Sequence, residues 1–134
     1  MIRHNRTVDG DRTFFDAIGG MPTIEKIVAS FYAEVALDAV LAPMYPADDM
    51  AGAEERLTFF LAQYWGGPTT YSEQRGHPRL RMRHAPYVVD SAARDRWLHC
   101  FRVGLDAVDL TPEQDAEFWA YVTHAANFMI NSPG

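Results

Sequence analysis

Four arginines and two histidines lie close together in one short segment of the chain, residues 75–86. The whole chain carries a formal net charge of −6, so these cations are concentrated against an acidic background. Clustered cations in an acidic protein are typical of a local anion site, such as one for the acidic groups of a cofactor. His84 stands two residues before Pro86, where a rigid turn would hold its imidazole at the edge of the core, and such a histidine can ligate a metal.

The same residues have simpler interpretations, which the residue pattern alone leaves open. A histidine at this place can face solvent, and the arginines, Arg75 and Arg81 above all, can belong to a solvated basic loop. Tyr32 and Trp97 lie on apolar helix faces, where aromatic residues usually serve as core packing. Cys100 is most simply a small buried hydrophobe.

The elements that position these residues are predicted to be helices throughout, because apolar residues recur at intervals of three and four. Asp90 is a favourable N-cap, and Thr111 with Gln114 forms a capping box. The segment 69–76 has the composition of a turn. Helices are expected at residues 14–18, 22–35, 48–64, 78–85, 90–108 and 111–129.

The fold is predicted to be all-α, with helices packed at angles rather than as a regular up-and-down bundle, because the loops are unequal in length. One domain is expected over residues 13–134, preceded at 1–12 by a polar tail without apolar periodicity. Tyr32 and Ala53 fall on the inner faces of the two first long helices. The other residues expected to face inward include Met50, Leu57, Phe60, Leu61, Tyr64, Ala93, Trp97, Phe101, Leu105, Phe118, Val122 and Met129.

Charge and composition exclude several classes of protein. General binding to nucleic acid or to an anionic membrane needs a broad positive face, which an acidic chain does not favour. Cys100 is the one cysteine, so no internal disulfide can form. No signal-type apolar segment lies near Met1 and no run reaches about 18 apolar residues, which predicts a soluble, cytoplasmic protein without membrane insertion. A di-iron carboxylate bundle is excluded because the chain has no Glu-x-x-His pair.

Several short motifs follow one another along the chain in a specific order and spacing. They are Phe14 to Gly20 with its final Gly-Gly, Phe31-Tyr32, Tyr45-Pro46, Ala53-Glu54-Glu55-Arg56-Leu57, Tyr64-Trp65-Gly66-Gly67-Pro68, Arg83-His84-Ala85-Pro86 and Trp97. Taken together, they resemble the motifs of the group II truncated haemoglobins, small globins in which two helices lie across two others around a haem. The resemblance covers about residues 13–133. The resemblance implies a two-over-two truncated globin fold with haem b, iron protoporphyrin IX, as cofactor.

The resemblance also implies roles for individual residues. His84 would be the proximal ligand of the haem iron, and Tyr32, Tyr45 and Trp97 would be distal hydrogen-bonding residues. Ala53 would occupy the place where many globins carry a distal His or Gln. Because alanine has no donor, the hydrogen bonds to the ligand would come from the two tyrosines and from Trp97. The ligand site would comprise Tyr32, Tyr45, Ala53, Leu57 and Trp97. The haem site would comprise Tyr45, Arg56, Leu57, Phe60, Tyr64, His77, Arg79, Met82, Arg83, His84 and Trp97. Arg56, Arg83 and either His77 or Arg79 would face the propionates.

The function implied is reversible binding of oxygen and related diatomic ligands. The alternative within the haem class is a redox enzyme that oxidises nitric oxide or reduces peroxide. Such an enzyme would need an external reductase as partner, since the chain has no Gly-x-Gly-x-x-Gly fingerprint for a nicotinamide or flavin. The alternative without haem is a helical interaction or nucleic-acid module that uses the arginine-rich segment as its contact surface. The oligomeric state stays open, a homo-oligomer included.

Overall fold

The computed structural model describes residues 13–45, 48–75 and 90–129, and every regular element in these ranges is a helix. The prediction of an all-α fold is therefore confirmed. The elements are α1 (Phe14–Ala17), α2 (Met21–Leu37), the 3-10 helix η1 (Ala42–Met44), α3 (Met50–Tyr64), α4 (Thr70–Arg75), α6 (Ser91–Asp106) and α7 (Pro112–Phe128). The helix expected at 78–85 and the tail expected at 1–12 lie outside the described residues.

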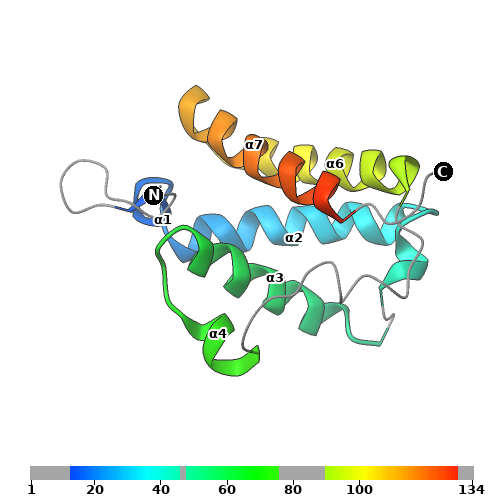
Figure 1. Ribbon diagram of the computed structural model, residues 1–134, viewed down its shortest axis with the longest axis horizontal. Helices are drawn as coiled ribbons and strands as arrows, with labels where there is room; N and C mark the ends of the chain where they lie inside the picture. The colour runs from blue at the N-terminus through cyan, green and yellow to red at the C-terminus, as the bar shows by residue number, and fades with distance from the viewer. Residues whose placement is uncertain (1–12, 46–47, 76–89, 130–134) are drawn as a thin grey trace.

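Two pairs of helices form two layers (Figure 1). α6 and α7 lie side by side in one layer, and α2 and α3 lie side by side in the other. α2 is the central helix because it packs against both α3 and α6. The crossing of α2 and α6 is close at Gly104, where a Cβ atom would lie 2.7 Å from the carbonyl oxygen of Ile27. Glycine is therefore required at this crossing. The two layers of two helices confirm the expected two-over-two arrangement.

The core fills the space between the two layers. Trp65, which follows α3, is fully buried there, and its ring contacts Phe14 of α1 and Phe118 of α7 at centroid distances of 5.0 and 4.4 Å. Full burial of a large apolar side chain stabilises a protein by roughly 1.5–3 kcal/mol, so residues of this kind dominate the stability of the fold. The other large, fully buried side chains include Ile24, Ile27, Val28, Phe31, Val35, Leu61, Phe101, Leu105 and Val122.

The starts of the last two helices follow the local sequence signals. Asp90 Oδ1 accepts a hydrogen bond of 2.9 Å from the backbone N–H of Ala93 at the start of α6. At the start of α7, Thr111 Oγ1 accepts from the N–H of Gln114, and Gln114 Oε1 accepts from the N–H of Thr111. The predicted N-cap and capping box are both confirmed. Each satisfies backbone donors that a helix terminus otherwise leaves unpaired.

The expectation of a turn over residues 69–76 is wrong, because α4 forms there. Tyr71 of α4 is buried, and its ring packs edge-on against Phe60 of α3 at a centroid distance of 5.4 Å. The backbone N–H of Ser72 donates to Gln63 Oε1 of α3 at 2.9 Å. Thr and Ser are weak helix formers, so local preference gave no indication of this helix. Packing against α3 outweighs that preference.

The apolar stripe of α3 is only partly covered. Ala53 and Leu61 are buried as expected, whereas Leu57, Phe60 and Tyr64 are half-buried against the edge of the core. α3 therefore presents a row of large apolar side chains that the described part of the protein covers incompletely.

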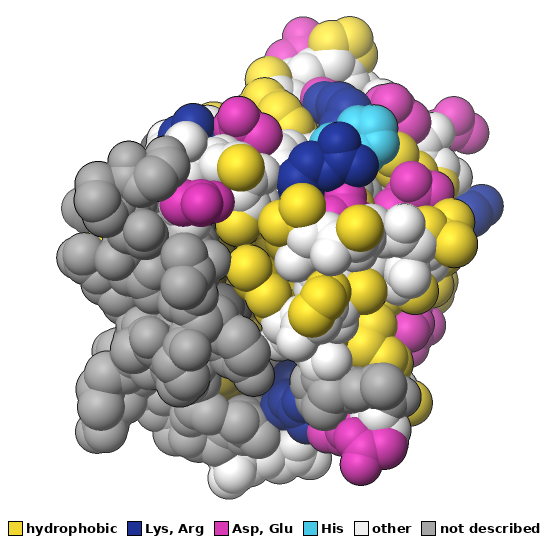
Figure 2. Space-filling model, turned by 90° about the vertical axis from the view of Figure 1, so that its right-hand side faces the viewer, with side chains coloured by type: hydrophobic (Ala, Val, Ile, Leu, Met, Phe, Trp, Pro, Cys, Tyr) yellow, Lys and Arg dark blue, Asp and Glu magenta, His cyan; other side chains and the backbone are white. Residues whose placement is uncertain are grey.

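Apolar side chains also gather on the side of the molecule where α2 ends and α6 begins (Figure 2). Leu37, the last residue of α2, and Val40 shortly after it are exposed, as is Phe128 at the end of α7. Exposed apolar residues are common on protein surfaces. None of the helices in the described ranges combines the length and the apolar character needed to cross a bilayer.

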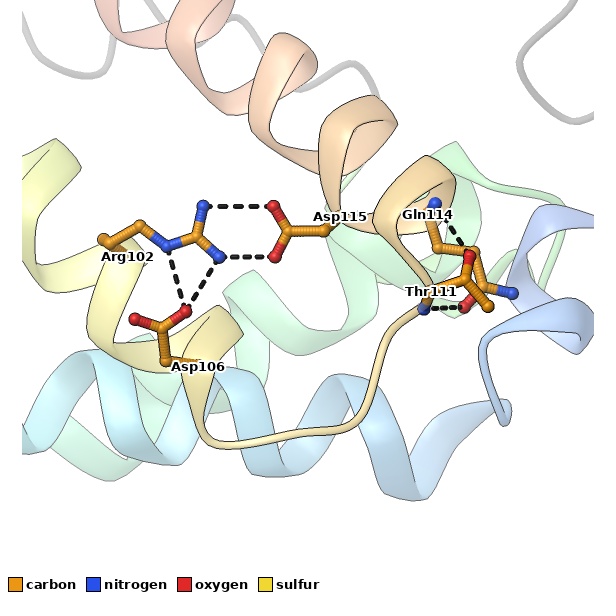
Figure 3. A network of polar contacts seen from close by, with 5 residues as sticks. All are labelled: Arg102, Asp106, Thr111, Gln114 and Asp115. Atoms are coloured by element: carbon orange, nitrogen blue, oxygen red, sulfur yellow. Dashed lines mark hydrogen bonds and ion pairs between the residues drawn. The ribbon is translucent and has the colours of Figure 1, made fainter.

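Arg102 links α6 to α7 through an ion pair (Figure 3). Arg102 of α6 donates to both carboxylate oxygens of Asp115 on α7, with 3.1 Å between Nη1 and Oδ1. Its Nη2 also donates to Asp106 on the same helix at 3.0 Å. The guanidinium carbon lies 5.1 Å from the ring centroid of Trp119. Because these groups are partly exposed, each ion pair contributes about 0–1 kcal/mol to stability.

Candidate functional site

Four aromatic rings form a continuous series of contacts between α6 and the residue after η1. The ring of Trp97 on α6 lies edge-on to Phe31 on α2, with centroids 5.6 Å apart. Phe31 contacts Tyr32 at 4.9 Å, and Tyr32 contacts Tyr45 at 5.4 Å, again edge-on. One series of ring contacts thus links Tyr32, Tyr45 and Trp97, the three residues of the predicted ligand site that were expected to form hydrogen bonds. Their role toward a ligand stays a prediction.

The geometry of α2 explains why Phe31 and Tyr32 have different partners. Successive residues on an α-helix are rotated by about 100° around its axis. Phe31 is fully buried and contacts Trp97 and Phe101 of α6, at 5.6 and 4.6 Å. Tyr32 lies further around the helix, and its ring contacts Tyr45 instead. One helix therefore supplies both a core residue that supports Trp97 and a polar side chain of the candidate site.

The hydroxyl of Tyr32 is kept protonated by its surroundings. The side chain is 7% exposed, and this burial raises the pKa of the phenol far above its ordinary value. Tyr45 raises the pKa further, whereas the positive charge of Arg56 lowers it in part. At neutral pH the Tyr32 hydroxyl is therefore a hydrogen-bond donor.

α3 contributes an apolar wall to the candidate site. Ala53 is buried within the core cluster that also contains Tyr32, and its methyl group can neither donate nor accept a hydrogen bond. Leu57, one turn later, is half-buried against the same cluster. Tyr45 and Trp97, which carry polar hydrogens, are also packed against this core cluster. Small-molecule sites typically combine apolar surface with a few polar groups.

Further along α3, two predicted haem-contact residues are held by neighbouring helices. Tyr64 stacks on Tyr121 of α7 with ring centroids 4.0 Å apart, and Phe60 packs against Tyr71 of α4. Burial raises the pKa of Tyr64, and the nearby charge of Glu117 raises it further. Both rings are thus oriented by packing, while their contact with haem stays a prediction.

Arg56 is fixed by an ion pair at the start of α3. Its Nη1 donates to Oδ2 of Asp49 at 3.2 Å, and Asp49 is the residue directly before the helix. Gly52 permits this contact, because a Cβ atom there would overlap the Asp49 carboxylate. The Arg56 side chain is about one-third exposed, so part of the guanidinium faces water. Its predicted contact with a haem propionate stays a prediction.

The remaining residues of the predicted haem site lie outside the described part of the chain. They are His77, Arg79, Met82, Arg83 and His84. Where side chains are described, no group of three or more His, Cys, Asp or Glu could hold a metal ion. A haem requires no such group, since its iron takes one axial histidine from the protein. His99 and His124, for which no site was expected, are exposed.

Sequence reasoning missed Asp38 and Arg96, which meet beside the candidate site. Nε of Arg96 donates to Oδ2 of Asp38 at 2.6 Å. The two residues lie 58 positions apart, so no local spacing connects them. The available hint was an acidic residue placed directly after the apolar stripe of α2.

The described residues fit a haem. Leu57, Phe60 and Tyr64 leave an apolar face that a flat, largely apolar cofactor can cover. The protonated hydroxyl of Tyr32 and the indole N–H of Trp97 are donors suited to a small ligand that accepts hydrogen bonds. A two-over-two helical fold with a site of this composition defines a haem-binding globin of the truncated class.

Comparison with known proteins assigns the family. The chain belongs to the bacterial-like globin family, whose model matches residues 13–131. A group 2 truncated haemoglobin of Bacillus subtilis is 35% identical over 117 residues, which cover 87% of each chain. The solved structure of a thermostable haemoglobin from Thermobifida fusca is 51% identical, with a TM-score of 0.88, and covers 91% of this chain and 99% of the other. The group II truncated haemoglobin of Bacillus anthracis has a TM-score of 0.88 at 33% identity, with 94% and 96% covered.

These similarities confirm the resemblance to the group II truncated haemoglobins that the sequence motifs indicated. Membership of this family implies haem as the cofactor and binding of small ligands at that haem as the general activity.

Proposed function

We propose that this globin binds oxygen and related diatomic ligands reversibly on haem b, with Trp97 and Tyr32 donating hydrogen bonds to the ligand. Haem supplies an iron atom that, held by one histidine, keeps a coordination position open for such a ligand. His84 is the proposed proximal residue. We place the protein in the cytoplasm, with an electron-donating reductase as the partner that would keep the iron reduced.

The series of ring contacts from Trp97 to Tyr45 is the observation that carries the proposal. It links donors from two different helices into one packed unit, so their separation is set by the core rather than by a loop. The indole N–H of Trp97 can only donate, and the buried hydroxyl of Tyr32 keeps its proton. Donors of this kind favour a ligand that gains negative charge on binding, as oxygen does, over one that stays nearly neutral, such as carbon monoxide.

Ala53 strengthens this assignment of donors. It is buried in the core cluster that also contains Tyr32, and its side chain has no polar atom. Trp97 and Tyr32 would therefore determine which ligands bind preferentially. Tyr45 packs against Tyr32 and would supply a further hydroxyl group. The small side chain of Ala53 would also leave space beside the ligand for entry of small molecules.

A relative supports oxygen as the ligand. A solved structure of a truncated haemoglobin from Bacillus subtilis is described as that of an oxygen-avid protein. It is 33% identical to this chain with a TM-score of 0.83, and covers 90% of this chain and all of the other.

At the mouth of the site, Arg56 and Arg83 are proposed to face the haem propionates, together with His77 or Arg79. Arg56 already pairs with Asp49, so a propionate would share its guanidinium with that carboxylate. Because the guanidinium is partly exposed, its contact with a propionate should contribute about 0–1 kcal/mol.

Absorption spectra of the purified protein test the proposal. The ferrous protein should form distinct oxygen and carbon monoxide complexes, and removal of oxygen should restore the ferrous spectrum. His84→Ala should lose haem or hold it loosely. His99→Ala is the matched control, because His99 is exposed on α6 and should leave haem content unchanged. A full haem complement with the spectrum of wild-type protein in His84→Ala would show that another residue holds the iron.

A further inference from the structure

Asp38 is a buried carboxylate at the end of α2. The residue is 5% exposed, and it accepts three hydrogen bonds. Oδ1 accepts from the backbone N–H groups of Val40 and Leu41, at 2.9 and 3.0 Å. Oδ2 accepts from Nε of Arg96 on α6, at 2.6 Å. Both oxygens of this carboxylate are thus engaged, each by a different part of the fold.

The first part is the turn that leads to Tyr45. Besides the two side-chain contacts, the carbonyl oxygen of Asp38 accepts from the N–H of Ala42 at 2.9 Å. The carbonyl oxygen of Ala42 in turn accepts from the N–H of Tyr45 at 3.2 Å, and Leu41, the residue before Ala42, is buried. The conformation of residues 38–45 is therefore specified from Asp38 onwards, and Tyr45 lies at its far end.

The second part is the segment of α6 that carries Trp97. Arg96 directly precedes Trp97, and neighbouring residues in a helix move together because they share a rigid backbone. The ring of Trp97 contacts Phe31 and Phe101, at 5.6 and 4.8 Å, but remains half-buried. Packing alone therefore leaves one side of the indole unsupported by the described residues.

We propose that Asp38 and Arg96 form a positioning pair that fixes Trp97 and Tyr45, the two ends of the series of ring contacts that runs through Phe31 and Tyr32. This proposal rests on the proposed function, in which Trp97 donates to the ligand. The pair joins α2 to α6 beside the site, so it sets how far the indole of Trp97 stands from the hydroxyls of Tyr32 and Tyr45.

The electrostatics of Asp38 explain why the pair holds one geometry. Burial alone raises the pKa of this carboxyl, but the hydrogen bonds from Arg96 and from the N–H groups of Leu41 and Val40 outweigh burial and lower the pKa. The carboxylate is therefore charged at neutral pH. A buried charge that loses a partner is strongly destabilised, so displacement of Arg96 from Asp38 is unfavourable.

Fluorine NMR of the carbon monoxide form of the holoprotein, labelled with 5-fluorotryptophan, tests the placement directly. The chain has three tryptophans, Trp65, Trp97 and Trp119, and Trp97→Phe identifies the resonance of Trp97 by its loss. Asp38→Asn keeps an acceptor for the two backbone N–H groups, but replaces the oxygen that accepts from Arg96 by an amide NH2, so both the charge and the hydrogen bond that hold Arg96 are lost. It should shift or broaden the Trp97 resonance and leave the other two in place.

Arg102→Gln is the matched control, because it breaks a different ion pair on the same helix. Arg102 lies over the ring of Trp119, so this variant should move the Trp119 resonance and not that of Trp97. Arg96→Gln removes the other member of the proposed pair from an exposed position and should reproduce the effect of Asp38→Asn. If Asp38→Asn fails to fold, Arg96→Gln decides. An unchanged Trp97 resonance in a folded variant of either residue would overturn the proposal.

Oxygen dissociation provides a second readout that a purely structural role would not change. Asp38→Asn should release oxygen about twofold to tenfold faster, as expected for coupling between neighbouring residues. In a Trp97→Phe background the same substitution should accelerate oxygen release less, because only the placement of Tyr45 is then lost, whereas equal acceleration in both backgrounds would show that Asp38 does not act through Trp97. If Trp97→Phe alone leaves oxygen release unchanged, the donor role of Trp97 fails, and the NMR pattern still decides whether the pair positions the indole.

Discussion

Replacing Trp97 by phenylalanine removes the indole N–H but keeps an aromatic ring at the same place on α6. In the structure this ring lies 5.6 Å from Phe31 and 4.8 Å from Phe101, and a phenyl ring can retain much of both contacts. Trp97 is also only half-buried, so the smaller ring leaves little empty space in the core. The main consequence of Trp97→Phe is therefore the loss of one hydrogen-bond donor.

The magnitude of this loss follows from the strength of the bond. A hydrogen bond to a charged or partly charged acceptor contributes roughly 1.5–3 kcal/mol. Because about 1.4 kcal/mol corresponds to a factor of ten, oxygen should dissociate on the order of ten to a hundred times faster from Trp97→Phe. Carbon monoxide carries much less negative charge when it binds, so its dissociation should change far less.

Stopped-flow displacement of each gas from wild type, Trp97→Phe and Tyr32→Phe measures this contrast. Trp119→Phe on α7 is the matched control, since this tryptophan packs under Arg102 and not in the ring series of the site. Equal acceleration of both gases in Trp97→Phe would indicate that the substitution merely opens the site. No acceleration of oxygen release would mean that Trp97 packs beside the ligand without donating to it.

Three further substitutions test other parts of the structure. Gly104→Ala should lower the free energy of unfolding by about 1–3 kcal/mol, because the added Cβ would lie 2.7 Å from the carbonyl oxygen of Ile27; an unchanged urea midpoint would contradict this close crossing. The lowered pKa of Asp38 gives stability that is present above the ordinary Asp pKa of about 3.9 and is lost as the pH falls through the lower folded-state value. Acid titration of Asp38→Asn should therefore show a shallower loss of stability below about pH 4 than wild type, and parallel curves would refute this. Arg56→Ala should modestly speed transfer of haem to an apoprotein acceptor, with a difference from wild type that shrinks as salt rises; identical rates at low salt would exclude a propionate contact.

Local chemistry made much of the fold predictable. The apolar spacing of α2, α6 and α7 identified their buried faces, and Asp90 and Thr111 cap the helices they were expected to cap. These features depend on residues three or four positions apart, so the sequence displays them directly. α4 was missed for the opposite reason, because Tyr71 is buried by contact with a helix that the local sequence does not show.

The sequence identified the aromatic residues of the candidate site, but it did not identify the ion pair that lies beside them. Tyr32, Tyr45 and Trp97 were expected together through a resemblance to a known family, and the ring contacts bring them together. The contact between Asp38 and Arg96 joins residues far apart in the chain, and only packing of α2 against α6 creates it. Burial of a carboxylate has no signature in sequence periodicity, because the pattern records apolar residues alone.

Because α2 supplies both a core residue and a residue of the candidate site, it limits how the site of this globin can evolve. Phe31 contacts Trp97, Tyr32 and Phe101 while being fully buried, so a substitution there would change the stability of the protein and the shape of its site together. Leu57 on α3, which is also predicted to line the ligand site, is half-buried, so it can vary at a smaller loss of packing. New ligand preferences should therefore arise more readily by changes on α3 than on α2, which acts as the fixed half of the site.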